Sequence, residues 1–276
     1  MKKSTLHKLR SILSGIFKRA IGQGCRPGYN PIREVTPPKG LPSEETYAYS
    51  LHEIRQLLGL ISDEITRLIV ALAGYVGLSK SEIQGLTWEA YDAESGEIKV
   101  ISGVVNGKRG DAKTKARKAS VPLIPSVREL LDLYRLRLGN PSTGVMFATE
   151  VGTPVDLKNL FTRRIEPVLK ACDECGKVVE KHGDEEHEFR PRKDLIEWHG
   201  WHAFRRGLAS NLNELHVPDL TIQRILRHSN VATTRKAYIK IREDGVTAGM
   251  AQMEAEIRRV QMLQVRTETQ KAERPN

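Results

Sequence analysis

The chain is poor in the features that mark secreted and membrane proteins. Its 276 residues include three cysteines, Cys25, Cys172 and Cys175, too few for a disulfide framework. No apolar run approaches the ~20 residues that a membrane helix needs. Basic residues such as Lys8 and Lys18 interrupt the N-terminal stretch where a signal peptide would be uninterrupted. We therefore expect a soluble protein of the reducing cytoplasm, with no membrane partner.

Acidic residues are outnumbered by basic ones. The chain has 44 Lys and Arg against 34 Asp and Glu, a net charge of +10, which favours a polyanionic partner, nucleic acid before a membrane surface. Residues 1–40 hold nine basic residues and one acidic residue, so the excess is concentrated there. On charge alone, this segment is either a solubilising tail or a DNA-touching segment.

The spacing of apolar residues and the glycine and proline content divide the chain near residue 45. Apolar residues recur at helical spacing within residues 5–22, which predicts an amphipathic helix that must bury its stripe against a partner. Residues 22–45 are dense in Gly and Pro and predict an extended linker. We expect a basic helix and linker over 1–45 and a separate domain over 46–276.

The pattern beyond residue 46 predicts a mainly α body with a small β-sheet, an α+β fold. Ser50 with Glu53, and Ser79 with Glu82, have capping-box spacing that marks helix starts. Two strands joined by a turn rich in Asn, Gly and Lys predict a basic hairpin; they cover 97–105 and 115–124. Helices are expected at 63–76, 126–138, 156–171, 202–214, 218–227 and 246–264.

Two stretches of the C-terminal half gather residues suited to phosphate chemistry. In WHAFRRG, which begins at Trp201, a helix would place His202 and Arg205 on one face. Together they could bind an anionic ligand such as phosphate. The later stretch LTIQRILRHSNVATTRKAY carries His228 after an apolar helix and Tyr238 ten residues further on.

The order His-x-x-Arg, Leu-x-His-Ser, Thr-Thr and Tyr resembles the tyrosine recombinases of the phage integrase family, over roughly residues 5–260. The resemblance implies a mobile-element DNA recombinase with its catalytic domain over 46–276, whose chemistry uses no metal or nucleotide cofactor. Tyr238 would attack the scissile phosphodiester, forming a 3′-phosphotyrosyl bond and releasing a 5′-hydroxyl. Duplex DNA is the implied substrate, with a tetrameric synapse of copies of the chain. The segment 246–264 would dock on a neighbouring copy or fold back on its own domain.

The resemblance also assigns roles to the other site residues. Arg205, His202 and His228 would stabilise the charge that gathers on the phosphate oxygens. Cations near Tyr238 would favour its phenolate, because a tyrosine with the ordinary pKa of ~10 is a poor nucleophile. The hairpin lysine that protonates the leaving oxygen corresponds to Lys113, with Lys115 as the alternative. The residues expected to contact DNA are Lys80, Lys115, Arg117, Arg206 and Arg227.

The sequence departs from the family at a second phosphate-binding arginine. Where the family has Gly-Leu-Arg-x-x-Glu, this chain has Ser79 in place of the arginine and Lys80 beside it. Loss of one such donor typically costs ~10²- to 10³-fold in rate. Ser79 is well explained as a helix cap with Glu82, whereas Lys80 is an imperfect substitute for a guanidinium. The alternative function is therefore a catalytically inactive DNA-binding relic or accessory protein of a mobile element; a topoisomerase is a third interpretation.

Two further departures concern segments outside the motifs. Residues 5–30 resemble only the last helix of the family's core-binding domain, so we expect an N-terminally truncated chain that binds DNA weakly. An insertion at 172–189 carries Cys172 and Cys175 at zinc-knuckle spacing, followed by His182 and His187. These four residues would form a structural zinc site; the alternative is a hydrophilic loop with two unpaired thiols.

Overall fold

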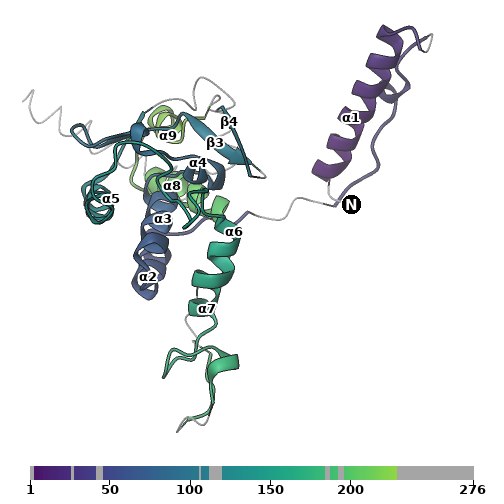
Figure 1. Ribbon diagram of the computed structural model, residues 1–276. Helices are drawn as coiled ribbons and strands as arrows, with labels where there is room; N and C mark the ends of the chain where they lie inside the picture. Colours follow the sequence, from purple (N-terminus) through teal and green to yellow (C-terminus); the bar gives the residue numbers. More distant parts are fainter. Residues whose placement is uncertain are drawn as a thin grey trace, which may run out of the picture. The chain divides into compact units, whose positions relative to one another are not determined.

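The computed structural model describes residues 3–25, 28–41, 46–105, 107–111, 120–183, 187–191 and 196–228. They belong to two compact units, Met1–Thr46 and Tyr47–Asn276 (Figure 1). Within the described residues, no helix combines the length and apolar character needed to cross a membrane.

The first unit is a helix with the following segment folded against it. Helix α1 (Lys3–Gly22) covers the helix expected at 5–22. Residues 28–41 of the Gly- and Pro-rich segment run back along α1: the Asn30 side chain donates to the Ser14 carbonyl (3.0 Å), and the Lys3 N–H donates to the Leu41 carbonyl (3.0 Å). Part of the apolar stripe on α1, including Ile12, stays exposed.

The second unit is built mainly from helices, and local caps explain where two of them begin. Glu53 accepts from the Ser50 N–H (2.8 Å) while Ser50 Oγ accepts from the Glu53 N–H (3.2 Å), so the first expected capping box is confirmed. Asp63 caps the next helix by accepting from the Thr66 N–H (2.9 Å). The helices are α2 (Leu51–Leu60), α3 (Glu64–Tyr75), α4 (Lys80–Gln84), α5 (Pro125–Arg137), α6 (Leu157–Leu160), α7 (Glu166–Leu169), α8 (Trp201–Glu214) and α9 (Asp219–Ile225).

The helix expected over 156–171 is interrupted. A π-helical turn, Phe161–Ile165, separates α6 from α7. Pro167 follows this turn and has no N–H to donate to the preceding turn of helix, which fits a local departure from α-helical hydrogen bonding.

The strands form two small antiparallel sheets in the described part of the chain. One has the order β1 (Tyr91–Asp92), β2 (Glu97–Lys99) and β5 (Ser120–Pro122), with Ile98 opposite Val121. The other pairs β3 (Ser102–Val105) with β4 (Lys108–Asp111).

The single basic hairpin expected from 97–105 and 115–124 is therefore wrong in part. Its first strand breaks after Lys99: β2 pairs with β5, whereas β3 turns back at once onto β4. Val105 lies opposite Lys108, and Gly107 adopts a φ of +73°, which the tight turn between them favours. The mainly α fold class with a small β-sheet is confirmed.

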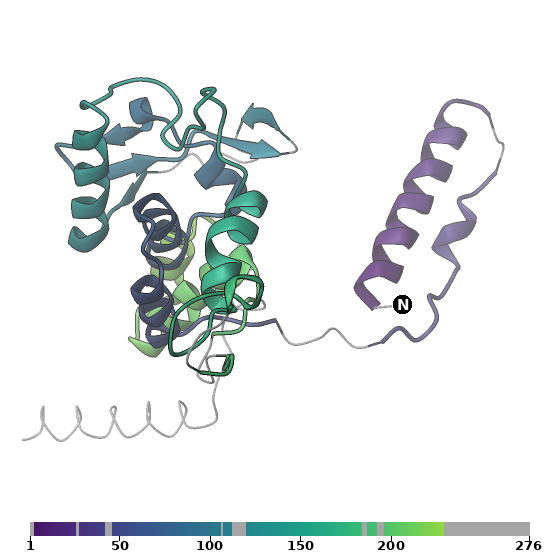
Figure 2. The same ribbon diagram turned by 60° about the horizontal axis from the view of Figure 1, so that its bottom comes forward.

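Helix α8 contacts α2, α3 and α9. It packs beside α3, which also contacts α5 (Figure 2). A Cβ at Gly207 would come within 2.2 Å of the Tyr49 carbonyl oxygen, so the absence of a side chain lets the chain at Tyr49 cross α8 closely. Asn211 secures that crossing by donating to the same carbonyl (3.2 Å). The buried face of α8 is thereby fixed in position.

Candidate active site

Helix α8 presents Arg205 to the protein interior. The Arg205 side chain is 2% exposed, whereas His202, one turn earlier, is exposed. The Arg205 guanidinium donates from Nη1 to the Gly77 carbonyl (2.6 Å) and from Nη2 to the Leu226 carbonyl. Its Nε lies 3.4 Å from His228 Nε2. Arg205 thus joins the loop after α3 to the turn that ends α9, and brings His228 to its side.

Gly77 shapes the acceptor that holds Arg205. Its φ of +71° lies in the left-handed region that glycine adopts without cost. A Cβ at this position would come within 2.7 Å of Leu208 Cδ2, on the helix that carries Arg205. The close approach of this loop to α8 therefore depends on glycine.

A buried carboxylate, Glu82 of α4, lies between two arginines. Its Oε2 is 3.2 Å from Arg227 Nη2 and 3.5 Å from Arg205 Nη1, and it accepts from the Ser79 N–H (2.8 Å). Burial raises the pKa of Glu82, but the charges of Arg227 and Arg205 and the Ser79 N–H outweigh it and hold the pKa below its ordinary value. Glu82 is therefore an anion between two cations.

Arg227, which was expected to contact DNA, is buried in this arrangement. Its side chain is 0% exposed and is paired with Glu82. The backbone of Arg227 has a φ of +54°, unusual for a residue with a side chain, and the N–H of Arg227 closes the turn onto the Arg224 carbonyl (3.0 Å). The Arg227 guanidinium thus holds the Glu82 carboxylate beside Arg205.

Ser79 occupies the start of α4. Its N–H donates to Glu82, as the capping pattern predicts, and its Oγ lies 3.3 Å from Ser81 Oγ. The next residue, Lys80, has a side chain that is 42% exposed and lies 3.9 Å from Asp156. Arg206, which was also expected at DNA, donates to the Tyr47 carbonyl.

The remaining predicted site residues lie outside the described residues. These are the nucleophile Tyr238, the lysine candidates Lys113 and Lys115, and Arg117. Of the five predicted catalytic residues, the structure thus describes three, and it brings Arg205 and His228 into contact.

Comparison with known proteins shows to which family the chain belongs. The model of the phage integrase family matches residues 50–244, most of the chain and all of the elements that carry Arg205, Glu82 and His228. The chain belongs to the phage integrase family.

Similar proteins with curated names are tyrosine recombinases. The integrase-family chain is 25% identical over 268 residues to a tyrosine recombinase XerC-like protein of Caldanaerobacter subterraneus, covering 86% of this chain and 62% of that protein. It is 27% identical over 242 residues to the tyrosine recombinase XerC of Pseudomonas entomophila, covering 84% of this chain and 68% of that protein. The chain therefore spans less than two thirds of the first relative.

Solved structures show the same fold. The Tn1549 transposon integrase in complex with transposon right end DNA superposes with a TM-score of 0.67 at 19% identity, covering 92% of this chain and 80% of that one. A lambda integrase dimer bound to a core site gives a TM-score of 0.53 at 18% identity, with coverages of 84% and 61%. The expected catalytic-domain fold of the phage integrase family is confirmed.

Sequence reasoning missed the groups that hold Arg205 in place. The acceptors of Gly77 and Leu226 are backbone carbonyls, which every residue has. The sequence therefore cannot predict that these two hold Arg205. Glu82 was recognised as a cap, but its second role between two arginines depends on Arg227, which is 145 residues away.

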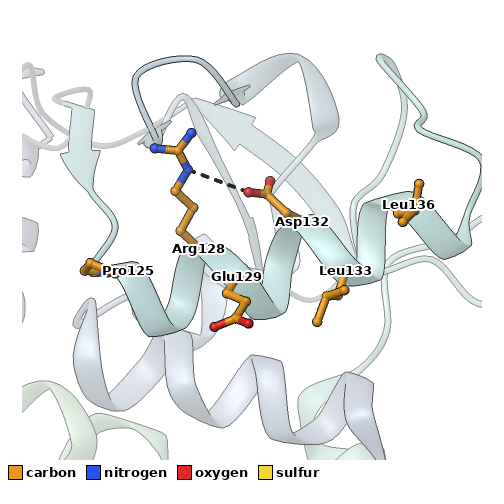
Figure 3. Close-up of a pocket in the computed structure, with 6 residues that line it drawn as sticks. All are labelled: Pro125, Arg128, Glu129, Asp132, Leu133 and Leu136. Atoms are coloured by element: carbon orange, nitrogen blue, oxygen red, sulfur yellow. Dashed lines mark ion pairs between the residues drawn. The ribbon is translucent and has the colours of Figure 1, made fainter.

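A surface hollow of about 410 Å³ lies elsewhere on this integrase-family chain, along α5 (Figure 3). Its walls include Arg128 and Asp132, which form an ion pair at 3.6 Å, and the apolar side chains of Leu133 and Leu136. All of its lining residues come from α5, so it does not bring reactive groups together from different elements.

Proposed function

We propose that the chain is a site-specific DNA recombinase that acts on duplex DNA through a 3′-phosphotyrosyl intermediate. The observation that carries the proposal is the contact between Arg205 and His228, two residues 23 positions apart whose side chains meet at 3.4 Å between α8 and α9. A guanidinium and an imidazole converging at one point suit the charge of a phosphoryl-transfer transition state.

The chemistry assigns a task to each residue. A histidine of the site, His202 or His228, takes the proton of the Tyr238 phenol, whose oxygen attacks phosphorus. The P–O bond to the 5′-oxygen breaks, and Lys113 gives a proton to that oxygen. Arg205 and the two histidines, His202 and His228, stabilise the charge on the non-bridging oxygens. A 5′-hydroxyl of the partner strand then reverses the step, so the energy of the phosphodiester is conserved.

A second candidate function, DNA binding without cleavage, is favoured by specific observations. Ser79 stands where the family has an arginine, and it lies in a cap. The Arg205 guanidinium is buried and donates to the carbonyls of Gly77 and Leu226. A chain of this kind would retain the fold and a basic surface but would not transfer the phosphoryl group.

A suicide substrate separates the two functions. A duplex with a nick next to the scissile phosphate traps the covalent adduct, because the released strand end diffuses away. We expect an adduct with the chain as it stands and none with Tyr238→Phe. Tyr29→Phe, the same change at an exposed tyrosine of the first unit, should leave the adduct unchanged. DNA binding without any adduct would refute the recombinase proposal.

The effect of Ser79 is tested by Ser79→Arg. The substitution keeps the backbone N–H that donates to Glu82 but removes the Ser79 hydroxyl from the capping box and from its contact with Ser81 Oγ, so circular dichroism must first show that α4 remains folded. A restored guanidinium should raise the rate of adduct formation by up to ~10²- to 10³-fold. An adduct that appears only with Ser79→Arg would identify the present chain as a binding protein.

We further propose that several copies assemble on DNA, since strand exchange needs more than one active site at a synapse. Sedimentation of the chain with and without a duplex tests this: a change from monomer to higher assemblies on DNA is expected, and a monomer on DNA at all concentrations would contradict it.

A further inference from the structure

The chain after α7 forms an appendage whose two sides meet at its base. Cys172 and Pro191 form a β-bridge, and the Asp173 N–H donates to the Arg190 carbonyl (2.8 Å). In Figures 1 and 2 this part lies beyond the end of α7, away from α4 and the strands. It is therefore separate from the Arg205 site within the same unit.

Four metal-ligating side chains converge inside this appendage. The ligand atoms of Cys172, Cys175, His182 and His187 all lie within 4.8 Å of one another. Zinc bonds of ~2.3 Å to sulfur and ~2.0–2.1 Å to nitrogen place tetrahedral ligand atoms roughly 3.3–3.8 Å apart. His187 Nε2 already lies 3.3 Å from Cys172 Sγ and 3.3 Å from His182 Nε2. Two pairs thus already have the spacing that one zinc ion needs, and the remaining pairs, at no more than 4.8 Å, need only a small approach of their side chains.

Hydrogen bonds alone do not explain this convergence. A ring nitrogen carries either one hydrogen or one lone pair, and so it makes one well-directed hydrogen bond. His187 Nε2 faces both a thiol and a second imidazole at equal distance. A cation at the centre, bound through the lone pairs of both imidazoles and both sulfurs, satisfies all of these groups at once.

The groups around the cluster orient its ligands. His187 Nδ1 lies 3.5 Å from Glu174 Oε2, and the other oxygen of Glu174 lies 3.3 Å from Arg190 Nη1. A carboxylate that accepts from Nδ1 leaves the Nε2 lone pair directed at the cluster, the arrangement that supports metal-bound histidines. Cys172 is fully buried, which keeps its sulfur away from competing water.

We propose that Cys172, Cys175, His182 and His187 bind one structural Zn²⁺ ion. Two sulfur and two nitrogen ligands in a tetrahedral set favour zinc over the oxygen-seeking cations Mg²⁺ and Ca²⁺. Four protein ligands leave no position for water or substrate, so the ion has no part in the phosphoryl transfer. Its effect is to tie the two sides of the appendage together.

Metal analysis of the full chain tests the site. We expect about one tightly bound zinc per chain, and Co²⁺ in its place should give the visible absorption of tetrahedral thiolate coordination. The variants Cys175→Ser and His182→Gln change partly exposed ligands, so that failure to fold is not confused with failure to bind. Both should lose stoichiometric zinc, while Cys25→Ser, the same change at the exposed cysteine of the first unit, should keep it.

A second variant and a protease measurement extend the test. Glu174→Gln should weaken zinc binding by about 10- to 100-fold through His187. Chelation should make the appendage sensitive to trypsin at Lys177 and Lys181, with the far-UV circular dichroism of the helical body unchanged. Less than half an equivalent of zinc in the unmodified chain, or equal zinc in Cys175→Ser and Cys25→Ser, would overturn the proposal.

Discussion

The guanidinium of Arg227 lies 3.2 Å from the carboxylate of Glu82, although 145 residues separate them in the chain. The same carboxylate oxygen lies 3.5 Å from Arg205. One anion therefore balances two cations at a place where all three side chains are buried. The position of Arg205 in the candidate active site depends on this balance.

Removal of Glu82 is expected to unfold the chain more easily. Glu82→Ala leaves two buried guanidiniums without their counter-charge, and breaking a buried ion pair from one side typically costs ~3–5 kcal/mol. Urea denaturation measures the change in the free energy of unfolding. The control is Glu166→Ala, which removes an exposed pair with Lys170 (2.7 Å) and should cost less than ~1 kcal/mol. Equal losses for the two variants would contradict the central role of Glu82.

Stability should depend on pH through Glu82. Its pKa is lower in the folded chain than the ordinary 4.5, so the folded state binds fewer protons than the unfolded state. The Glu82 carboxylate makes its full contribution to the free energy of unfolding above about pH 4.5. This contribution is lost as the pH falls through the lowered pKa of Glu82. Glu82→Gln has no such titration, so its urea midpoint should fall less between pH 6 and pH 4 than that of the unmodified chain. Parallel curves would show that Glu82 does not titrate as inferred.

A methyl group at Gly77 should disturb both the fold and the site. Gly77→Ala combines a left-handed backbone with a contact of 2.7 Å to Leu208 Cδ2, whereas Gly139→Ala has a similar φ of +78° and open space. The backbone cost alone is ~1–2 kcal/mol. Gly139→Ala should show only that loss, and Gly77→Ala a larger one with slower adduct formation, because the Gly77 carbonyl holds Arg205. Thermal denaturation distinguishes the two variants.

Arg227→Gly compares the cost of the strained backbone at Arg227 with the stability gained from its ion pair with Glu82. Glycine at a φ of +54° should remove ~1 kcal/mol of backbone strain. The lost pair with Glu82 should cost ~3–5 kcal/mol, so a net loss of stability is expected. Asn140→Gly is the matched control: Asn140 has a φ of +58° and is exposed, so its replacement should be neutral or stabilising. A stabilised Arg227→Gly chain would show that the pair with Glu82 contributes little.

Replacement of Arg205 by lysine should separate binding from chemistry. A lysine cannot reach the carbonyls of Gly77 and Leu226 and also face His228, because its donors sit on one atom. Under the proposed function, adduct formation with the nicked duplex should fall by ~10²- to 10³-fold while duplex affinity changes little. Arg137→Lys on the exposed side of α5 serves as the control. An unchanged adduct rate would remove Arg205 from the catalytic set.

Much of the helical framework follows from local signals in the sequence. Ser50 and Glu53 are three residues apart, and the cap that they form needs no other part of the chain. The separate β3–β4 hairpin was not predicted, because the residues on both sides of Lys99 favour a strand and give no sign of a break. Which strand each of them pairs with depends on contacts across the sheet. The pairing of Arg227 with Glu82 could not be predicted, because 145 residues separate the two side chains in the chain.

The bridge between Cys172 and Pro191 has a consequence for how this chain can vary. Because the two sides of the appendage are already joined there, the intervening residues form a loop whose ends are held together independently of the helical body. Residues can be inserted between the four cluster side chains of this loop at little entropic cost, and the appendage offers an attachment point for a reporter or an affinity tag that leaves α8 and Arg205 in place.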